Sequence, residues 1–130
     1  MSGAELKTLR ESIGLPARWI ADMTNMDLRT VQYWEVDKFP IPEIVENLLI
    51  ELVDAIENKA ILMAKNIIAN RDPSAPSCKL IRYKSETALW LTDHDLGVRK
   101  IPVNCYAIML ARVRCILRNN GINVTIQYDV

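Results

Sequence analysis

The sequence predicts a mainly α-helical protein of the α+β class, with a bundle of short helices, then a long connecting helix and a small C-terminal α+β unit. Apolar residues recur at intervals of three and four through most of residues 1–70, which is the period of a helix with one buried face. After a linker at 71–77 that holds two prolines and two serines, an alternating apolar and polar pattern typical of strands appears twice. Two units, 1–70 and 78–130, are therefore expected, and a chain of 130 residues suits that division.

Three short helices are expected in the first 40 residues, at about 4–13, 16–23 and 28–36. Gly14 ends the first helix, and Pro16 suits the first helical position of the second because proline lacks an N–H that would stay unpaired there. Asn25 tolerates the left-handed backbone of a tight interhelical turn, and Asp27 can cap the third helix by accepting backbone N–H bonds. The expected apolar face of the second helix consists of Trp19, Ile20 and Met23.

A long helix is expected from about Pro42 to Asn70, with Pro73 beyond its end. Along it, alternating steps of four and three residues form an apolar seam of Leu49, Val53, Ile56, Ala60, Met63 and Ile67. Such a seam packs against another surface. Two partners remain open at this point, the C-terminal part of the same chain and a second copy of the protein.

The C-terminal half predicts a short sheet combined with helices. The expected elements are a strand at 79–83, a short helix capped by Ser85 and reaching Leu91, a polar turn ending at Gly97, a possible strand at 98–101, a helix from Pro102 to about Asn119 and a half-buried strand at 122–130. The longer helix of this half carries Tyr106, Leu110, Val113 and Leu117 on one face. Asn120 and Gly121 are typical of a helix end.

The net charge is zero, but the basic residues gather late in the chain. Residues 79–118 hold eight Lys or Arg against three Asp or Glu, whereas residues 1–40 hold five against six. A basic domain is the usual sign of nucleic-acid binding, and the N-terminal part lacks it in bulk. No apolar run approaches the ~20 residues of a membrane span, and no signal-peptide pattern precedes the first helix. A cytoplasmic protein with no membrane partner is therefore expected.

The residues that usually carry chemistry form no recognisable site. Cys78, Cys105 and Cys115 have neither the even count of a disulfide framework nor the close spacing of a zinc site, so buried reduced thiols are expected. The single histidine, His94, lies in a polar turn and is expected in a surface loop. The chain has no glycine-rich phosphate loop, nucleophile–base pair or paired-carboxylate motif. We therefore expect no enzyme activity, no bound metal and no cofactor.

Four residues over 15–34 have the spacing of a DNA-binding helix-turn-helix. Ala21 is small enough to let the next helix pack closely, Asn25 suits the turn, Met26 follows it as an apolar residue, and Val31 can lock the two helices together. Helix number and length alone would fit many bundles. It is the match at four positions that predicts a helix-turn-helix.

The same segment resembles a known family. The runs Ile20-Ala21, Asn25-Met26-Asp27 and Val31-Gln32-Tyr33-Trp34-Glu35 resemble the helix-turn-helix of the Cro/cI (XRE) family. The last run, followed by Ile41-Pro42 and a long helix, is similar to the small phage and bacterial repressors called anti-CRISPR-associated regulators and to their uncharacterised bacterial relatives. The resemblance covers about residues 4–55. Over residues 79–130 it extends only to the order of strand, loop and helix.

The resemblance implies a homodimer that binds an inverted repeat in its own promoter and represses it. It also implies that the C-terminal domain is the dimerisation unit. Two positions depart from the family pattern. Ala17 stands where a phosphate-contacting glutamine is frequent, and Val36 stands where a glycine commonly ends the recognition helix.

Helical geometry assigns candidate DNA contacts to the third helix and its surroundings. The expected base-reading residues are Arg29, Gln32, Tyr33 and Leu28. Arg29 can bond guanine and Gln32 can bond adenine in a bidentate manner, while Tyr33 and Thr30 reach a phosphate or a thymine methyl group. The expected phosphate contacts are Arg18, Thr30, Lys38 and Arg10. The expected dimerisation residues are Leu49, Val53, Ile56, Met63, Ile67, Ile122, Val124 and Ile126.

Three alternatives stay open. Arg29 and Gln32 would merely be solvated if the helices serve protein contacts. In an antitoxin or adaptor, the C-terminal domain would bind a partner protein. Its apolar binding patch would then be exposed in the free protein and not covered by self-association. The late basic residues could instead bind a nucleic acid, including RNA, although solvated arginines around a dimer core are the simpler interpretation. Those residues are Arg82, Lys84, Arg99, Lys100, Arg112, Arg114 and Arg118.

Overall fold

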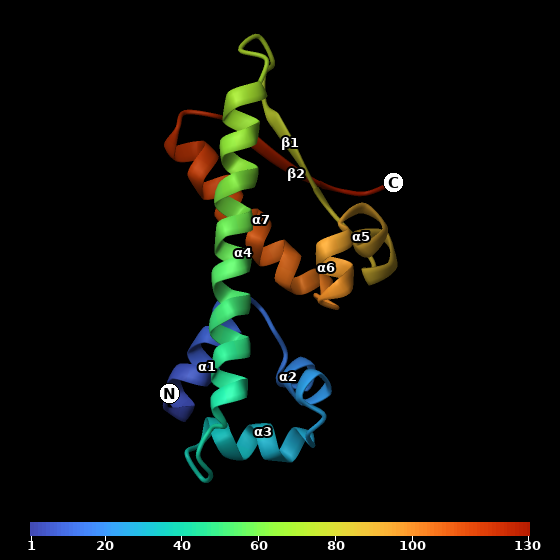
Figure 1. Ribbon diagram of the computed structural model, residues 1–130. Coiled ribbons are helices and arrows are strands. Elements are labelled where there is room, and N and C mark those ends of the chain that lie inside the picture. Colours follow the sequence, from blue (N-terminus) through green and yellow to red (C-terminus); the bar gives the residue numbers. More distant parts are fainter. The chain divides into compact units, whose positions relative to one another are not determined.

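The computed structural model describes residues 1–130 and contains seven helices and two strands (Figure 1). Helices dominate, and the strands form one parallel sheet, so the prediction of a mainly helical α+β protein is confirmed. The chain divides into two compact units, Met1–Ile56 and Glu57–Val130. This division falls inside the long helix, whereas the linker at 71–77 predicted a later one. No helix combines the length and the apolar character needed to cross a membrane.

The first unit holds α1 (Gly3–Ser12), α2 (Ala17–Thr24), α3 (Leu28–Glu35) and the beginning of α4 (Glu43–Asn70). A capping box starts α1, in which the side chains of Ser2 and Glu5 each accept a hydrogen bond from the other's backbone N–H. Gly14 follows α1 with a left-handed backbone, φ 68°, which glycine adopts without strain. The buried side chains of this unit include Leu6, Ile13, Leu15, Trp19, Ile20, Val31, Trp34, Val45 and Leu49.

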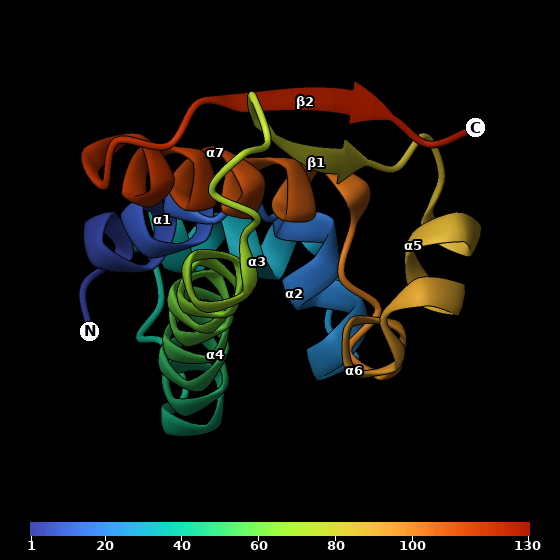
Figure 2. The same cartoon turned by 90° about the horizontal axis from the view of Figure 1, so that it is seen from above.

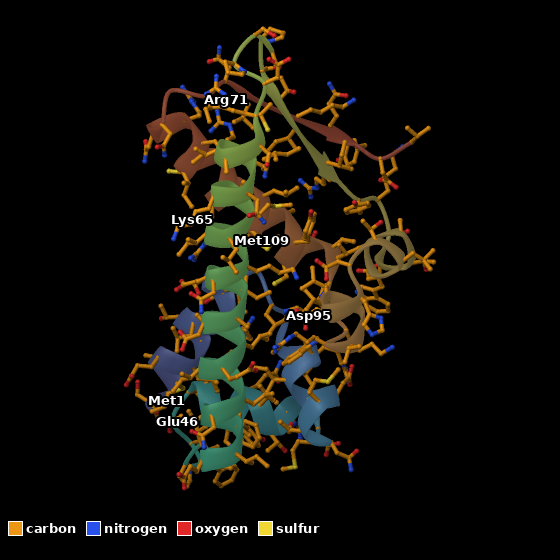
Figure 3. The ribbon with its side chains drawn as sticks, turned by 45° about the horizontal axis from the view of Figure 1, so that its top comes forward. Met1, Glu46, Lys65, Arg71, Asp95 and Met109 are labelled. Atoms are coloured by element: carbon orange, nitrogen blue, oxygen red, sulfur yellow. The ribbon has the colours of Figure 1, made fainter.

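An ion pair joins the start of the chain to the first turn of α4. The Met1 ammonium group lies 3.0 Å from Oε2 of Glu46, and Figure 3 shows these two residues side by side at one end of α4. The hydrogen bond to this carboxylate, helped by its charge, raises the pKa of the Met1 amino group. The contact therefore fastens α1 to α4 within the first unit.

Three local expectations for the first unit are wrong. Met23 is exposed, because the short helix α2 buries only the turn from Trp19 to Ala21. Pro16 is not helical but precedes α2 with an extended backbone. Asp27 does precede α3, yet its side chain makes no capping hydrogen bond; its backbone carbonyl instead accepts from Thr30 and Val31.

The side chains of the apolar seam of α4 are largely buried by the rest of the same chain. Leu49, Val53, Ile56 and Ala60 are buried, and Met63 and Ile67 are half-buried. The assignment of Leu49, Val53 and Ile56 to a dimer surface is therefore wrong, because a side chain covered by its own chain has no area left to offer a second copy. The exposed apolar residues of α4 lie outside the seam, at Ile44, Ile50, Ile61 and Leu62.

The second unit contains the rest of α4, β1 (Cys78–Arg82), α5 (Glu86–Thr92), α6 (His94–Val98), α7 (Val103–Asn119) and β2 (Val124–Tyr128). The two strands pair in parallel, with Leu80 opposite Ile126, and the three helices between them form the crossover that a parallel pair requires. Figure 2 shows the strands along α7, with β2 on the outer border of the unit. The expected face of α7 is confirmed, since Tyr106, Leu110, Val113 and Leu117 are all buried.

The region between α5 and α7 forms a helix rather than the possible strand at 98–101. The Asp93 side chain accepts a hydrogen bond from the backbone N–H of Leu96 and so starts α6, which has His94 as its first residue. Gly97 allows close packing, because a Cβ at this position would lie 3.0 Å from that of Trp90. His94 is exposed, as expected, but in a helix and not in a loop.

The last strand is not half-buried as its alternation predicted. Ile122, just before it, is buried by its own chain, so its assignment to a dimer surface is wrong for the same reason as that of Leu49. Ile126 is 41% exposed and Tyr128 is 60% exposed. The physical reason is the position of the sheet. Leu80 of β1 is buried, but β2 forms the outer edge of a sheet of only two strands, and its apolar side chains are only partly covered.

The three cysteines differ in their surroundings. Cys105 is buried on α7, Cys78 is half-buried at the start of β1, and Cys115 is exposed. The expectation of buried thiols therefore holds for Cys105 alone. Burial raises the pKa of the Cys105 thiol to about 12, and burial also raises the pKa of its neighbour Tyr106 to about 12.

Gly3→Ala should destabilise the protein even though alanine is the better helix former. A Cβ at this position would lie 2.4 Å from the carbonyl oxygen of Trp34 and 2.6 Å from that of Glu35, so the backbone must shift. Such overpacking costs about 1–3 kcal/mol, and urea denaturation would measure it. The neighbouring Ala4→Gly, at an exposed position, serves as the control for helix propensity alone. A Gly3→Ala variant more stable than the parent would contradict the close contact.

Raising the pH above 9 should destabilise the protein partly through Cys105. The unfolded thiol ionises near its ordinary pKa of 9.0, while the folded thiol keeps its proton up to about 12. Unfolding then releases a proton, so stability is complete below pH 9 and falls by up to about 1.4 kcal/mol per pH unit above it. Urea midpoints at pH 8 and 10.5 should therefore differ less in Cys105→Ala than in the parent. Equal differences would refute this source of pH dependence.

Candidate nucleic-acid interface

A tight turn of three residues joins α2 to α3. Asn25 has the left-handed backbone expected for it, with φ 55° and ψ 41°. The backbone N–H of Met26 donates to the carbonyl of Ala21 at 2.9 Å, which closes the end of α2. Ala21 and Val31 are both buried, as their places in the pattern required, whereas Met26 is exposed. The turn therefore holds two short helices in a fixed mutual arrangement.

The helix α3 presents one polar face to solvent. Arg29 and Gln32 are exposed, and Leu28, Thr30 and Tyr33 are half-buried. Val31 and Trp34 point into the core on the other side. Arg29 and Gln32 are three residues apart, so their side chains emerge from neighbouring turns of the same face. The structure thus brings together the residues that the sequence assigned to base reading.

A cationic and aromatic cluster follows the end of α3. The Lys38 ammonium lies 4.2 Å from the ring centre of Tyr33, and the Phe39 ring meets Tyr33 edge to face at 5.5 Å. The backbone N–H of Lys38 also donates to the carbonyl of Tyr33. These contacts keep a positive charge beside the exposed face of α3. The sequence assigned Lys38 a phosphate contact but gave no sign of this cluster.

Arg10, also expected to contact phosphate, is engaged inside the first unit. Its guanidinium donates to both carboxylate oxygens of Glu35, at 2.7 and 3.0 Å, and to the carbonyl of Leu15 at 2.9 Å. The Arg10 side chain is only 13% exposed. Its assignment to phosphate is therefore wrong, because the guanidinium is largely buried and its Nε, Nη1 and Nη2 atoms each donate within the unit. The pair links the last residue of α3 to α1.

A left-handed backbone position follows the end of α3, one residue later than Val36. Val36 has φ −104° and ψ 13°, a conformation open to any residue. The left-handed position comes one residue later, at Asp37 with φ 61°. The Asp37 carboxylate accepts a hydrogen bond from the backbone N–H of Gly3 at 2.7 Å. This bond and the Arg10–Glu35 pair both anchor the end of α3 to α1.

Cations and carboxylates are mixed around this surface. Arg18 on α2, Arg29 on α3 and Lys38 are exposed, and so are Asp22 and Asp27. The positive charge is therefore local rather than a property of the whole unit. No side chain caps the first turn of α2 or α3, which leaves the N-terminal ends of both helices open to an anion.

Most basic residues of the second unit have partners within that unit. Arg112 pairs with Glu57 at 2.7 Å, Arg99 pairs with Asp95 at 3.2 Å, and the Lys100 ammonium lies 5.1 Å from the ring centre of Trp90. Arg82 and Lys84 lie beside the Tyr128 ring. The cations of residues 79–118 are thus distributed over several helices and strands and do not form one row.

No family model matches this chain, and no curated protein matches it.

Arg10→Ala should destabilise the first unit strongly, because it leaves the Glu35 carboxylate, only 7% exposed, without its partner. The expected loss is on the order of 3 kcal/mol in the free energy of unfolding. Glu35→Ala should cost a similar amount, and the double variant should cost less than the sum, because both changes remove one interaction. Arg18→Ala, at an exposed arginine, is the control and should change stability by about 0.5 kcal/mol or less. Additive losses in the double variant would argue against coupling between Arg10 and Glu35.

Proposed function

We propose that this protein is a sequence-specific DNA-binding regulator of transcription, which acts as a homodimer on an inverted repeat and represses the promoter that contains it. In this proposal, α2, the turn at Asn25 and α3 form a helix-turn-helix, and α3 enters the major groove. The observation that carries the proposal is the exposed pair of Arg29 and Gln32 on a helix whose opposite face is locked into the core.

The chemistry of the two side chains fits base recognition. The major groove is wide enough for one α-helix, and there guanine offers O6 and N7 while adenine offers N6 and N7. The Arg29 guanidinium can donate two hydrogen bonds to guanine, and the Gln32 amide can bond both groups of adenine. Leu28 and Thr30 can contact thymine methyl groups at the edge of the same surface. Tyr33, which contacts Lys38 and Phe39, could meet the sugar-phosphate backbone.

Phosphate contacts would fix the register of α3. Arg18 lies in the first turn of α2, and Lys38 follows α3, so a cation stands beside each of the two helices. The uncapped N-terminal turn of α2 can add backbone N–H groups to a phosphate oxygen. Such contacts give affinity without sequence preference and make binding sensitive to salt.

Two copies are part of the proposal for a geometric reason. One helix reads only a few base pairs, whereas a symmetric dimer reads two half-sites about 34–36 Å apart and so requires an inverted repeat. The resemblance of residues 4–55 to the Cro/cI (XRE) family supports this assignment. A cytoplasmic location follows from the proposed function.

A second candidate function is that of an adaptor or antitoxin that binds a partner protein. The observation that favours it is the exposure of Leu91, at 84%, and of Val98 on the helices α5 and α6. Exposed apolar side chains can mark a protein interface when they form a patch. A partner of this kind would leave the DNA-binding assignment of the first unit unchanged.

Arg29→Ala should abolish selective binding and leave the fold intact. The side chain is exposed and faces away from Val31 and Trp34, so the melting temperature should stay close to that of the parent. Loss of a bidentate base contact costs about 1–3 kcal/mol per half-site, which is roughly a 5- to 150-fold loss of discrimination in each. The test is fluorescence anisotropy on the operator selected from random DNA, with scrambled DNA for comparison. An unchanged preference would exclude α3 as the reader.

The matched control for this test is Arg18→Ala. Loss of a phosphate contact should weaken binding to both DNAs about equally and reduce the slope of log affinity against log salt by ~1. The preference for the operator should survive. If Arg18→Ala removed only the operator preference, the assignment of phosphate contacts to α2 would be wrong.

A further inference from the structure

A cavity of about 580 Å³ lies at the C-terminal end of α4, within the second unit. Three segments line it: the last turns of α4, the linker with the first residue of β1, and the connection 121–123 between α7 and β2. Figure 3 shows Arg71 at this end of α4. Ligand-binding pockets usually measure about 300–1,000 Å³, so the cavity is large enough to hold a small molecule.

Two charged side chains of opposite sign line the cavity, Arg71 and Asp72, and its other lining residues are uncharged. The exposed Arg71 guanidinium makes no ion pair within the chain. The Asp72 carboxylate accepts hydrogen bonds from the backbone N–H and the hydroxyl of Ser74, at 2.9 and 2.7 Å. These bonds lower the pKa of Asp72, so its carboxylate is charged at neutral pH. Consecutive residues thus offer a free positive group and a fixed negative group.

The end of α4 adds partial negative charge to the same place. No backbone N–H beyond Asn70 donates to the last turn of this helix, so its final carbonyls keep free lone pairs. The last turn also contains no basic side chain. Because the aligned peptide dipoles make the C-terminal end of a helix favourable for a cation, a ligand's positive group is stabilised there. Ile67 and Asn70 of this turn both line the cavity.

Apolar side chains supply the rest of the binding surface. Ile122 is buried and Ile67 is half-buried, and Ala75 and Pro76 of the linker line the cavity as well. An apolar wall with a few polar groups is the usual composition of a small-molecule site. A phosphorylated ligand, which carries about two negative charges, would meet a lining whose own net charge is zero. The charges therefore favour a ligand that is itself neutral overall.

We propose that this cavity binds a free α-amino acid with an apolar side chain. The carboxylate of the ligand pairs with Arg71, and its ammonium group lies toward Asp72 and the end of α4. Its side chain contacts Ile67 and Ile122. An α-amino acid carries both charged groups on one carbon, which matches a guanidinium and a carboxylate on consecutive residues. The site lies wholly within the second unit and does not depend on the proposed function.

Isothermal titration calorimetry of the full chain without DNA tests the proposal, with L-leucine and L-phenylalanine as ligands. At least one of them should bind with 1:1 stoichiometry and a Kd below about 1 mM. The corresponding amide lacks the carboxylate, and the N-acetyl derivative lacks the ammonium group. Each derivative should bind roughly tenfold more weakly or worse, because one charged contact is lost. Flat titrations with both amino acids, or equal affinity for free and blocked forms, would overturn the proposal.

Two variants assign the charged contacts. Arg71→Gln should weaken binding of the free amino acid roughly tenfold or more, yet leave the affinity for the amide almost unchanged, because the amide has no carboxylate to lose. Asp72→Asn, which keeps an acceptor for Ser74, should weaken the free amino acid but not the N-acetyl derivative. Lys65→Gln removes an exposed cation of α4 outside the cavity and is the matched control, which should bind like the parent (Figure 3). Parent-like binding by Arg71→Gln would overturn the site.

The outcome separates this site from the proposed function. A chain that binds the amino acid but shows no preference for any DNA keeps the site and refutes the DNA-binding proposal. A chain that selects an operator but gives flat titrations with both amino acids does the reverse.

Discussion

The bidentate ion pair between Arg10 and Glu35 fixes the orientation of α3. A short helix of eight residues is not stable alone, so its direction depends on tertiary contacts. The Arg10 guanidinium supplies them by bonding the last residue of α3 and the carbonyl of Leu15 after α1. Gly3 adds a packing contact between α1 and α3, because the absence of its side chain allows α1 to approach the carbonyls of Trp34 and Glu35.

The end of α3 is fixed by these contacts. One face of the helix is buried in the core, and the opposite face is polar and exposed. Val31 and Trp34 are buried, so the polar face can carry Arg29 and Gln32 without contributing to the core. In the proposed function, sequence preference would rest on the positions of Arg29 and Gln32 rather than on net charge, which is zero for the whole chain. Long-range attraction to DNA would be weak for such a protein, and the few placed cations, Arg18 and Lys38, would supply most of it.

The elements around α7 in the second unit differ in how far they are buried. One face of that helix and Leu80 of β1 are buried, whereas β2 keeps both its edge and part of its apolar face in solvent. Within one chain, this arrangement leaves apolar area and backbone hydrogen bonds unused.

The sequence by itself determined where most helices begin and end, because these signals are local: the Ser2 and Ser85 caps, Gly14, and Asn25 at the turn. It also determined that Arg29 and Gln32 lie opposite Val31, since helical geometry requires it. Only the tertiary structure decided that Arg10 bonds Glu35, that the α4 seam is covered by its own chain and that β2 stays exposed. Periodicity tells which residues share a face but not what covers that face, and ion pairs between residues 25 positions apart leave no local pattern.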